Sequence, residues 1–115
     1  MTQEHNPMMV LVAGPYRSGT DGDPAKMAAN VDAMNQAALQ VFRAGHLPVT
    51  GEALALPLIE ISGAFDEIFH PIARRLVDRC DAVLRIGGPS TGADEMVERA
   101  QRHGAAIVHS VAELP

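Results

Sequence analysis

The segment RIGGPSTGADEM, residues 85–96, decides how this chain folds. It begins inside a short, partly β-branched apolar run at 82–86, which predicts a buried strand. Two glycines and a proline at 87–89 then stop the strand, because they cannot continue a central strand. Either Ser90 or Thr91 can cap the helix that follows, since a hydroxyl accepts from the orphan N–H groups of a first helical turn.

This segment also predicts a place for a ligand. Asp94 and Glu95 put negative charge in the first turn of the helix, where the helix dipole favours it. A strand, a glycine turn and a capped helix N-terminus together form a seat for a phosphate or a ribose hydroxyl. The alternative interpretation is an ordinary connection between a strand and a helix.

Composition limits what kind of protein this is. The 115 residues predict a disordered tail over 1–7 and one domain over 8–115. The formal net charge of −5, without a basic run, argues against binding to nucleic acid polymers or anionic membranes. The single Cys80 excludes an internal disulfide, and no apolar run approaches the ~20 residues of a membrane span. We therefore expect a soluble, cytoplasmic protein.

A second candidate loop follows the first apolar run. Residues 8–13 are continuously apolar, which predicts a strand covered on both faces, and Gly14-Pro15 ends it. The long polar loop at 16–23 is typical of the ligand contacts of α/β proteins, although it could also be a plain surface connection. Arg17 is the candidate in this loop for binding a phosphate, because a guanidinium donates two parallel hydrogen bonds.

The remaining elements alternate along the chain. Asp23 and Pro24 predict the start of a long helix, which ends at Gly45. An edge strand containing proline is expected at 47–50, and a turn of helix with a loop that could cover a site at 51–64. The next helix is expected to start near His70, so that Pro71 lies in its first turn, and the last elements are a helix at 92–103, a strand at 105–108 and a terminal turn.

This alternation predicts an α/β fold with a doubly wound parallel sheet and helices on both faces. Right-handed crossovers leave few orders for four strands, and 2-1-3-4 is the simplest of them, a flavodoxin- or Rossmann-like arrangement. In that order Gly14 and Gly87 stand at the carboxyl ends of neighbouring strands. The two glycine loops would then face each other across one crevice.

Four short motifs in this order resemble the nucleoside 2-deoxyribosyltransferase-like superfamily, closest to its small bacterial members: AGPYR at 13–17, AGH at 44–46, RCDAV at 79–83 and S-x-GA at 90–93. The resemblance implies a flavodoxin-like, often oligomeric domain that binds a nucleoside or nucleotide. Enzymes of this superfamily cleave or exchange the N-glycosidic bond through a carboxylate nucleophile. A looser similarity, in Gly87-Gly88 with Thr91 and Glu95, is to nucleoside-monophosphate phosphoribohydrolases, which attack the same bond.

The resemblance implies that Gly14, Tyr16 and Arg17 line the ligand and that Ser90 with Gly92 holds a phosphate or sugar. The full set of predicted binding residues comes from the two loops: Gly14, Pro15, Tyr16, Arg17, Gly87, Gly88, Ser90, Thr91, Gly92 and Ala93. No metal ligand is predicted, because the histidines show no metal spacing, and no cofactor is expected. A homodimer or larger homo-oligomer is expected, because so small a domain leaves apolar helix faces uncovered.

One residue departs from the pattern of the superfamily. Its nucleophilic glutamate stands four residues after the motif's glycine, where this chain has Met96. Glu95 is one residue away, which on a regular helix turns the side chain by about 100°. Either the turn differs by one residue and Glu95 is the catalytic carboxylate, with Asp66 as a possible second one, or the protein is a nucleotide-binding module without catalysis.

Overall fold

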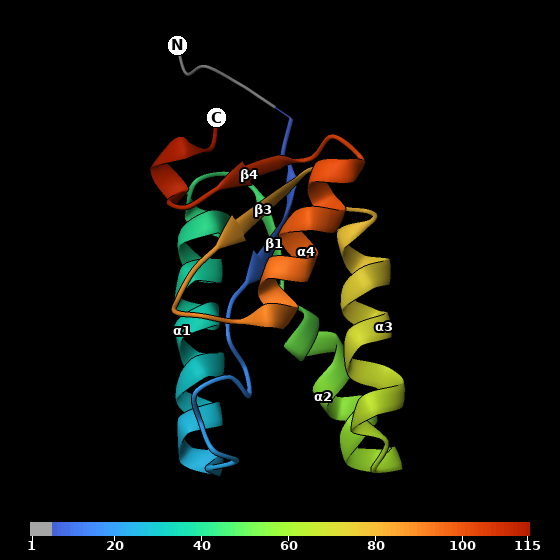
Figure 1. Cartoon of the computed structure of the whole chain (residues 1–115). Helices are drawn as coiled ribbons and strands as arrows, with labels where there is room; N and C mark the ends of the chain where they lie inside the picture. The colour runs from blue at the N-terminus through green and yellow to red at the C-terminus, as the bar shows by residue number, and fades with distance from the viewer. Residues whose placement is uncertain (1–5) are drawn as a thin grey trace.

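The sheet is built around β1 (Met9–Ala13), the second of its four strands. In the computed structural model, which describes residues 6–115, β1 pairs in parallel with β2 (Leu47–Val49) on one side and β3 (Ala82–Arg85) on the other. Strand β4 (Ala106–Val108) pairs in parallel with β3, so the order is β2-β1-β3-β4 (Figure 1). The predicted topology is confirmed: the chain has an α/β, Rossmann-like fold. Most of the predicted tail lies outside the described residues.

Both faces of the sheet are buried, as the continuous apolar runs predicted. Successive side chains of a strand point to opposite faces. Val10 and Val12 accordingly join a core with α1 (Pro24–Arg43), whereas Leu11 joins a second core with α3 (Phe65–Val77) and α4 (Thr91–Arg102). Figure 1 shows α1 on one side of the sheet and α3 and α4 on the other.

The first helix follows its predicted signals. The Asp23 side chain accepts a hydrogen bond of 2.9 Å from the Ala25 N–H, and Pro24 is the first helical residue. At the other end Gly45 has a φ of 97°, the left-handed conformation expected after a helix. Asn30, near the start of this helix, turns toward the loop after β1 and donates to the Tyr16 carbonyl at 2.8 Å. Helix α1 therefore fixes part of the candidate ligand loop.

The expectation of a turn and a loop at 51–64 is wrong, because this segment forms the helix α2 (Gly51–Ser62). The Thr50 hydroxyl caps it by accepting from the Ala53 N–H at 3.1 Å. The proline of α2, Pro57, lies on the exposed side of the helix. The residues that α2 buries are small or polar, whereas Leu54, Leu58 and Ile61 are exposed, so its large apolar residues do not mark the buried face of a helix.

Helix α3 also starts earlier than expected, at Phe65 rather than near His70. Pro71 lies inside the helix, although it removes one backbone N–H and was expected to mark the first turn. Close packing against α2 accompanies this early start, and Figure 1 shows the two helices side by side beyond the carboxyl ends of the strands. The first turn of α2 therefore lies at the edge of the sheet that carries the two glycine loops, and α3, which packs against α2, runs back toward the sheet.

Candidate functional site

The two glycine loops touch each other, as the strand order predicted. A Cβ at Gly14 would lie 3.1 Å from both the side chain and the carbonyl oxygen of Ile86. Gly87 has a φ of 78°, and a Cβ there would lie 2.7 Å from Cδ of Pro15. Glycine is therefore required at position 87 both by its backbone conformation and by the close approach of the first loop.

Arg85, the last residue of β3, holds the second loop from within. Its guanidinium donates to the carbonyl oxygens of Ile86 and Gly88 and to the carboxylate of Asp94, the last two at 3.0 and 3.1 Å. Ser90 rather than Thr91 is the cap of α4, and its hydroxyl accepts from the Ala93 N–H at 3.1 Å. These bonds fix the start of α4 against the end of β3.

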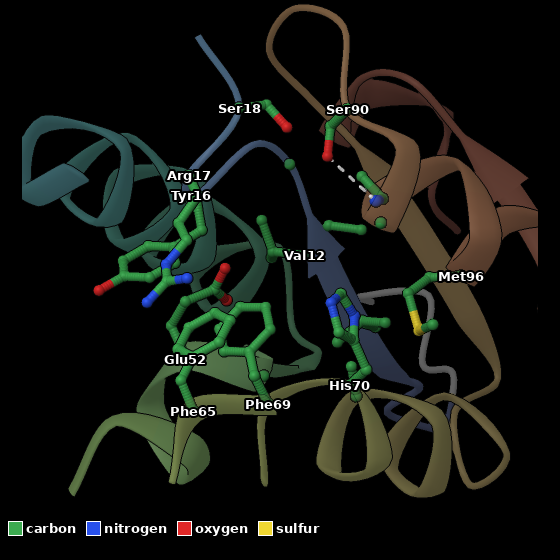
Figure 2. Close-up of a pocket in the computed structure, with 17 residues that line it drawn as sticks. Val12, Tyr16, Arg17, Ser18, Glu52, Phe65, Phe69, His70, Ser90 and Met96 are labelled. Atoms are coloured by element: carbon green, nitrogen blue, oxygen red, sulfur yellow. Dashed lines mark hydrogen bonds between the residues drawn. The ribbon is translucent and has the colours of Figure 1, made fainter. Parts of the chain in front are cut away.

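A cavity of about 200 Å³ lies between the loop after β1, the first turn of α2, residues 65–73 of α3 and the start of α4 (Figure 2). It is lined from the sheet by Leu11, Val12 and Ala13, from the first loop by Gly14, Tyr16, Arg17 and Ser18, and from the helices and their caps by Gly51, Glu52, Phe65, Phe69, His70, Ala73, Ser90, Gly92, Ala93 and Met96. The cavity therefore lies beside the first glycine loop and the start of α4, with α2 and α3 as its remaining walls, and Gly87 and Gly88 do not line it.

Three of the four aromatic residues of the chain gather at this cavity. The rings of Phe65 and Phe69 stack with centroids 4.7 Å apart, and Phe69 stacks on Tyr16 at 5.3 Å. The Arg17 guanidinium lies over the Phe65 ring, 3.5 Å from its centroid, in a cation–π contact. We call Tyr16, Phe65 and Phe69 the aromatic wall.

Glu52, in the first turn of α2, is a cavity residue that the sequence analysis did not predict. Among the described residues that line the cavity, it is the only one with a carboxyl group. Its side chain is buried, with the residue 6% exposed. Burial raises the pKa of Glu52 to about 7, against the opposing effect of a hydrogen bond from its own backbone N–H. A group of this kind carries a proton for part of the time at neutral pH.

The predicted binding residues divide into two sets. Those that line the cavity are Gly14, Tyr16, Arg17, Ser90, Gly92 and Ala93. Pro15, Gly87, Gly88 and Thr91 are not among its lining residues, and the first two pack against each other instead. Their contribution is to the shape of the loops.

Neither of the two predicted catalytic carboxylates lines the cavity. Glu95 accepts a hydrogen bond of 2.9 Å from the Arg74 guanidinium, which holds the pKa of this carboxyl below its ordinary value. Asp66 is exposed in the first turn of α3. Of the residues of α4, Gly92, Ala93 and Met96 line the cavity, and Met96 is 4% exposed. The hypothesis that a shifted turn brings Glu95 inward is therefore not the arrangement of this structure.

Among the residues of the cavity that were not predicted from the sequence are Glu52, Phe65, Phe69 and His70. They lie near the starts of α2 and α3, and both starts were predicted incorrectly. One feature could have identified Glu52 from the sequence. It follows β2, whose carboxyl end lies at the same edge of the sheet as Gly14 and Gly87. Within the described part of the chain, no group of three or more His, Cys, Asp or Glu residues is placed to hold a metal ion. Over the same residues, no helix is both long and apolar enough to cross a membrane.

Comparison of the whole sequence with protein-family models and with curated proteins gives no match. The proposals below therefore depend on the geometry of the cavity.

Proposed function

We propose that this protein binds a nucleoside monophosphate in the cavity beside the aromatic wall. The observation that carries this proposal is the gathering of Tyr16, Phe65 and Phe69 in one stack at the carboxyl edge of a parallel sheet. In open α/β sheets ligands bind at this edge, at the switch point between strands. Aromatic rings there offer a planar base a stacking surface that is worth ~1–3 kcal/mol per base.

The opposite end of the cavity suits the sugar and the phosphate. Ser18 of the first loop and Ser90 of the second line the cavity there (Figure 2). The N-terminus of α4 begins at the same place, and its dipole favours an anion. Arg17 makes no ion pair with the described residues. Its guanidinium can therefore leave its contact with the Phe65 ring and bind a phosphate.

The size of the cavity fits this division of the ligand. Sites that enclose a whole drug-sized ligand measure about 300–1,000 Å³. A cavity of about 200 Å³ would hold the base and part of the sugar and leave the phosphate at its mouth, near the loops. The resemblance to the nucleoside 2-deoxyribosyltransferase-like superfamily agrees with this class of ligand.

Binding without covalent chemistry at α4 is the function that the geometry supports best. The thioether of Met96 occupies the position expected for a nucleophilic carboxylate, and it cannot do the covalent work of one. N-glycosidic hydrolysis or deoxyribosyl transfer is the second candidate. One observation favours it, the Glu52 carboxyl buried in the same cavity.

Calorimetry with nucleoside monophosphates, the matching nucleosides and ribose 5-phosphate tests the proposed function. We expect each monophosphate to bind about 10- to 100-fold more tightly than its nucleoside, because hydrogen bonds to charged groups contribute ~1.5–3 kcal/mol. Ribose 5-phosphate should bind far more weakly, since it has nothing to stack. Equal affinity for nucleoside and monophosphate would refute the phosphate position, and no binding of any of them would refute the proposal.

Glu95→Gln tests whether the α4 carboxylate takes part. The substitution replaces a charged hydrogen bond between two half-buried side chains outside the cavity, so the free energy of unfolding should fall by only ~0.2–1 kcal/mol. Affinity for nucleoside monophosphates, and any release of free base followed by chromatography, should match the wild type. A loss of base release by several powers of ten would instead place Glu95 in a catalytic mechanism.

A homodimer or larger homo-oligomer is a further part of the proposal. Leu54, Leu58 and Ile61 of α2 are exposed at 51%, 45% and 84%, and their spacing of four and three residues places them on one face of the helix. Apolar side chains in such a stripe favour burial against another surface.

The cytoplasmic location is likewise an expectation, drawn from the single free Cys80.

A further inference from the structure

We propose that the Glu52 carboxyl hydrogen-bonds the edge of the base that stacks on the aromatic wall, and thereby decides which bases the protein accepts. This inference rests on the proposed nucleotide binding and assigns a role to the one cavity residue with a carboxyl group among those described. Figure 2 shows the Glu52 carboxylate pointing into the cavity from α2, on the side where the aromatic rings lie.

The backbone that carries this carboxyl is held on both sides of it. Thr50 caps α2 through its hydrogen bond with the Ala53 N–H, and Glu52 lies in the first turn of that helix. Gly51 packs against α3, where a Cβ would meet the Cβ of Ala73 at 3.6 Å. The start of α2 therefore lies against the helix that also carries Phe65 and Phe69.

Burial leaves this carboxyl with hydrogen-bonding capacity that a ligand can use. The described ion pairs, Arg74–Glu95, Arg85–Asp94 and Arg99–Asp78, do not include it. Its hydrogen bond is with its own backbone N–H, whereas two carboxyl oxygens together offer about four acceptor positions. A planar base on the aromatic wall has N–H groups and ring nitrogens in its plane, where a carboxyl at the side of the stack can reach them.

The two protonation states of Glu52 match different bases. A protonated carboxyl has one donor beside one acceptor, which complements the ring nitrogen and amino group of adenine or cytosine. An ionised carboxylate only accepts, which complements the neighbouring N1–H and N2–H₂ donors of guanine. Since burial places the pKa of Glu52 at about 7, both states are populated near neutral pH. Preference for adenine and cytosine over guanine should therefore be strongest in acid and should decline as the pH rises.

Other titratable groups also line the cavity, and their effects on binding must be distinguished from the effect of Glu52. The loop after β1 contributes Tyr16 and the permanently charged Arg17, and α3 contributes His70. Helix α4 and the sheet contribute no titratable side chain to the described lining of the cavity. His70→Asn, which removes the imidazole from the cavity, is the matched control. The phosphate of every ligand also titrates near pH 6, and it cancels when ligands are compared as ratios at one pH.

Isothermal calorimetry with AMP, CMP and GMP at pH 5.5 and pH 8.5 tests the inference. For the wild type and for His70→Asn, we expect the ratio of AMP to GMP affinity to fall by about tenfold or more between the two pH values, the size of one charged hydrogen bond. For Glu52→Gln, whose amide keeps one donor and one acceptor at every pH, the ratio should favour AMP and CMP and should not change with pH. Glu52→Asp, which withdraws the carboxyl by one methylene, should weaken the preference but keep its pH dependence.

A preference that is unaffected by pH in the wild type, or a pH dependence that survives in Glu52→Gln, would overturn the inference. Either result would leave the proposed function standing, because the monophosphates would still bind. Binding of none of the three nucleotides at either pH would refute both. Loss of the pH dependence in His70→Asn, with Glu52→Gln behaving as the wild type, would assign the selection to His70 and overturn the role of Glu52.

Discussion

Replacing Phe69 by alanine is expected to weaken the binding of a nucleoside monophosphate by about 5- to 150-fold, the effect of losing one base–aromatic stack worth ~1–3 kcal/mol. Phe69 makes the two shortest ring contacts of the aromatic wall, 4.7 Å to Phe65 and 5.3 Å to Tyr16. Its removal therefore breaks both ring contacts as well as the contact with the ligand. Calorimetry of the variant with AMP measures the loss.

The chain supplies a matched control in Phe42, the one aromatic residue outside the wall. Phe42 lies on α1, is 65% exposed and is not among the residues that line the cavity. Phe42→Ala should bind AMP as tightly as the wild type. An affinity in Phe69→Ala equal to that in Phe42→Ala would mean that the base does not stack on the wall. Thermal melting of both variants shows whether a loss of affinity follows from a loss of folded protein.

Gly87→Ala is expected to lower the free energy of unfolding by about 2 kcal/mol or more and to remove most nucleotide binding. A non-glycine residue at a φ of 78° costs ~1–2 kcal/mol, and the new Cβ would stand 2.7 Å from Cδ of Pro15. One of the two loops must then move, and Tyr16 follows Pro15 directly. Urea denaturation and calorimetry with AMP measure the two effects.

Gly88→Ala is the control, one residue further along the same loop. No atom lies within 4 Å of a Cβ at position 88, and its φ lies outside the left-handed range. The substitution should change stability by no more than ~0.5 kcal/mol. Equal stability of the two variants would show that the contact between the loops does not matter for the fold.

The sheet could be predicted from the sequence because its strands are marked by local chemistry. Continuous apolar runs ended by Gly14-Pro15 and by the glycines at 87–88 identify buried parallel strands, and right-handed crossovers then leave one simple order. Helix α2 could not be predicted in this way. Its buried residues are Gly51, Glu52 and Ala55, and Leu54, Leu58 and Ile61 are exposed, so large apolar residues do not mark its buried face.

Only the part of the cavity wall that the glycine loops form was predicted from the sequence. Tyr16, Arg17 and Ser90 were found because they follow recognisable strand ends. Glu52 and the phenylalanines were not, because their place depends on how α2 and α3 pack against each other, which is a tertiary property. On α4 one residue separates an outward Glu95 from an inward Met96, which is the rotation of about 100° per residue of a helix.

The pairing of β1 with both β2 and β3 also determines when the protein is able to fold during its synthesis. Val10 pairs with Ala82, so β1 lacks its second neighbour until the chain beyond position 82 has been made. At ~5–20 residues per second, roughly 2 to 7 s pass between the completion of Val49 and of Arg85. For most of this interval α3 is incomplete, and α4 is not complete until Arg102, so the face of β1 that carries Leu11 lacks its full cover. On the ribosome, the apolar face of the first half of the chain therefore stays exposed until late in synthesis. The domain completes its fold only when its last elements have been made.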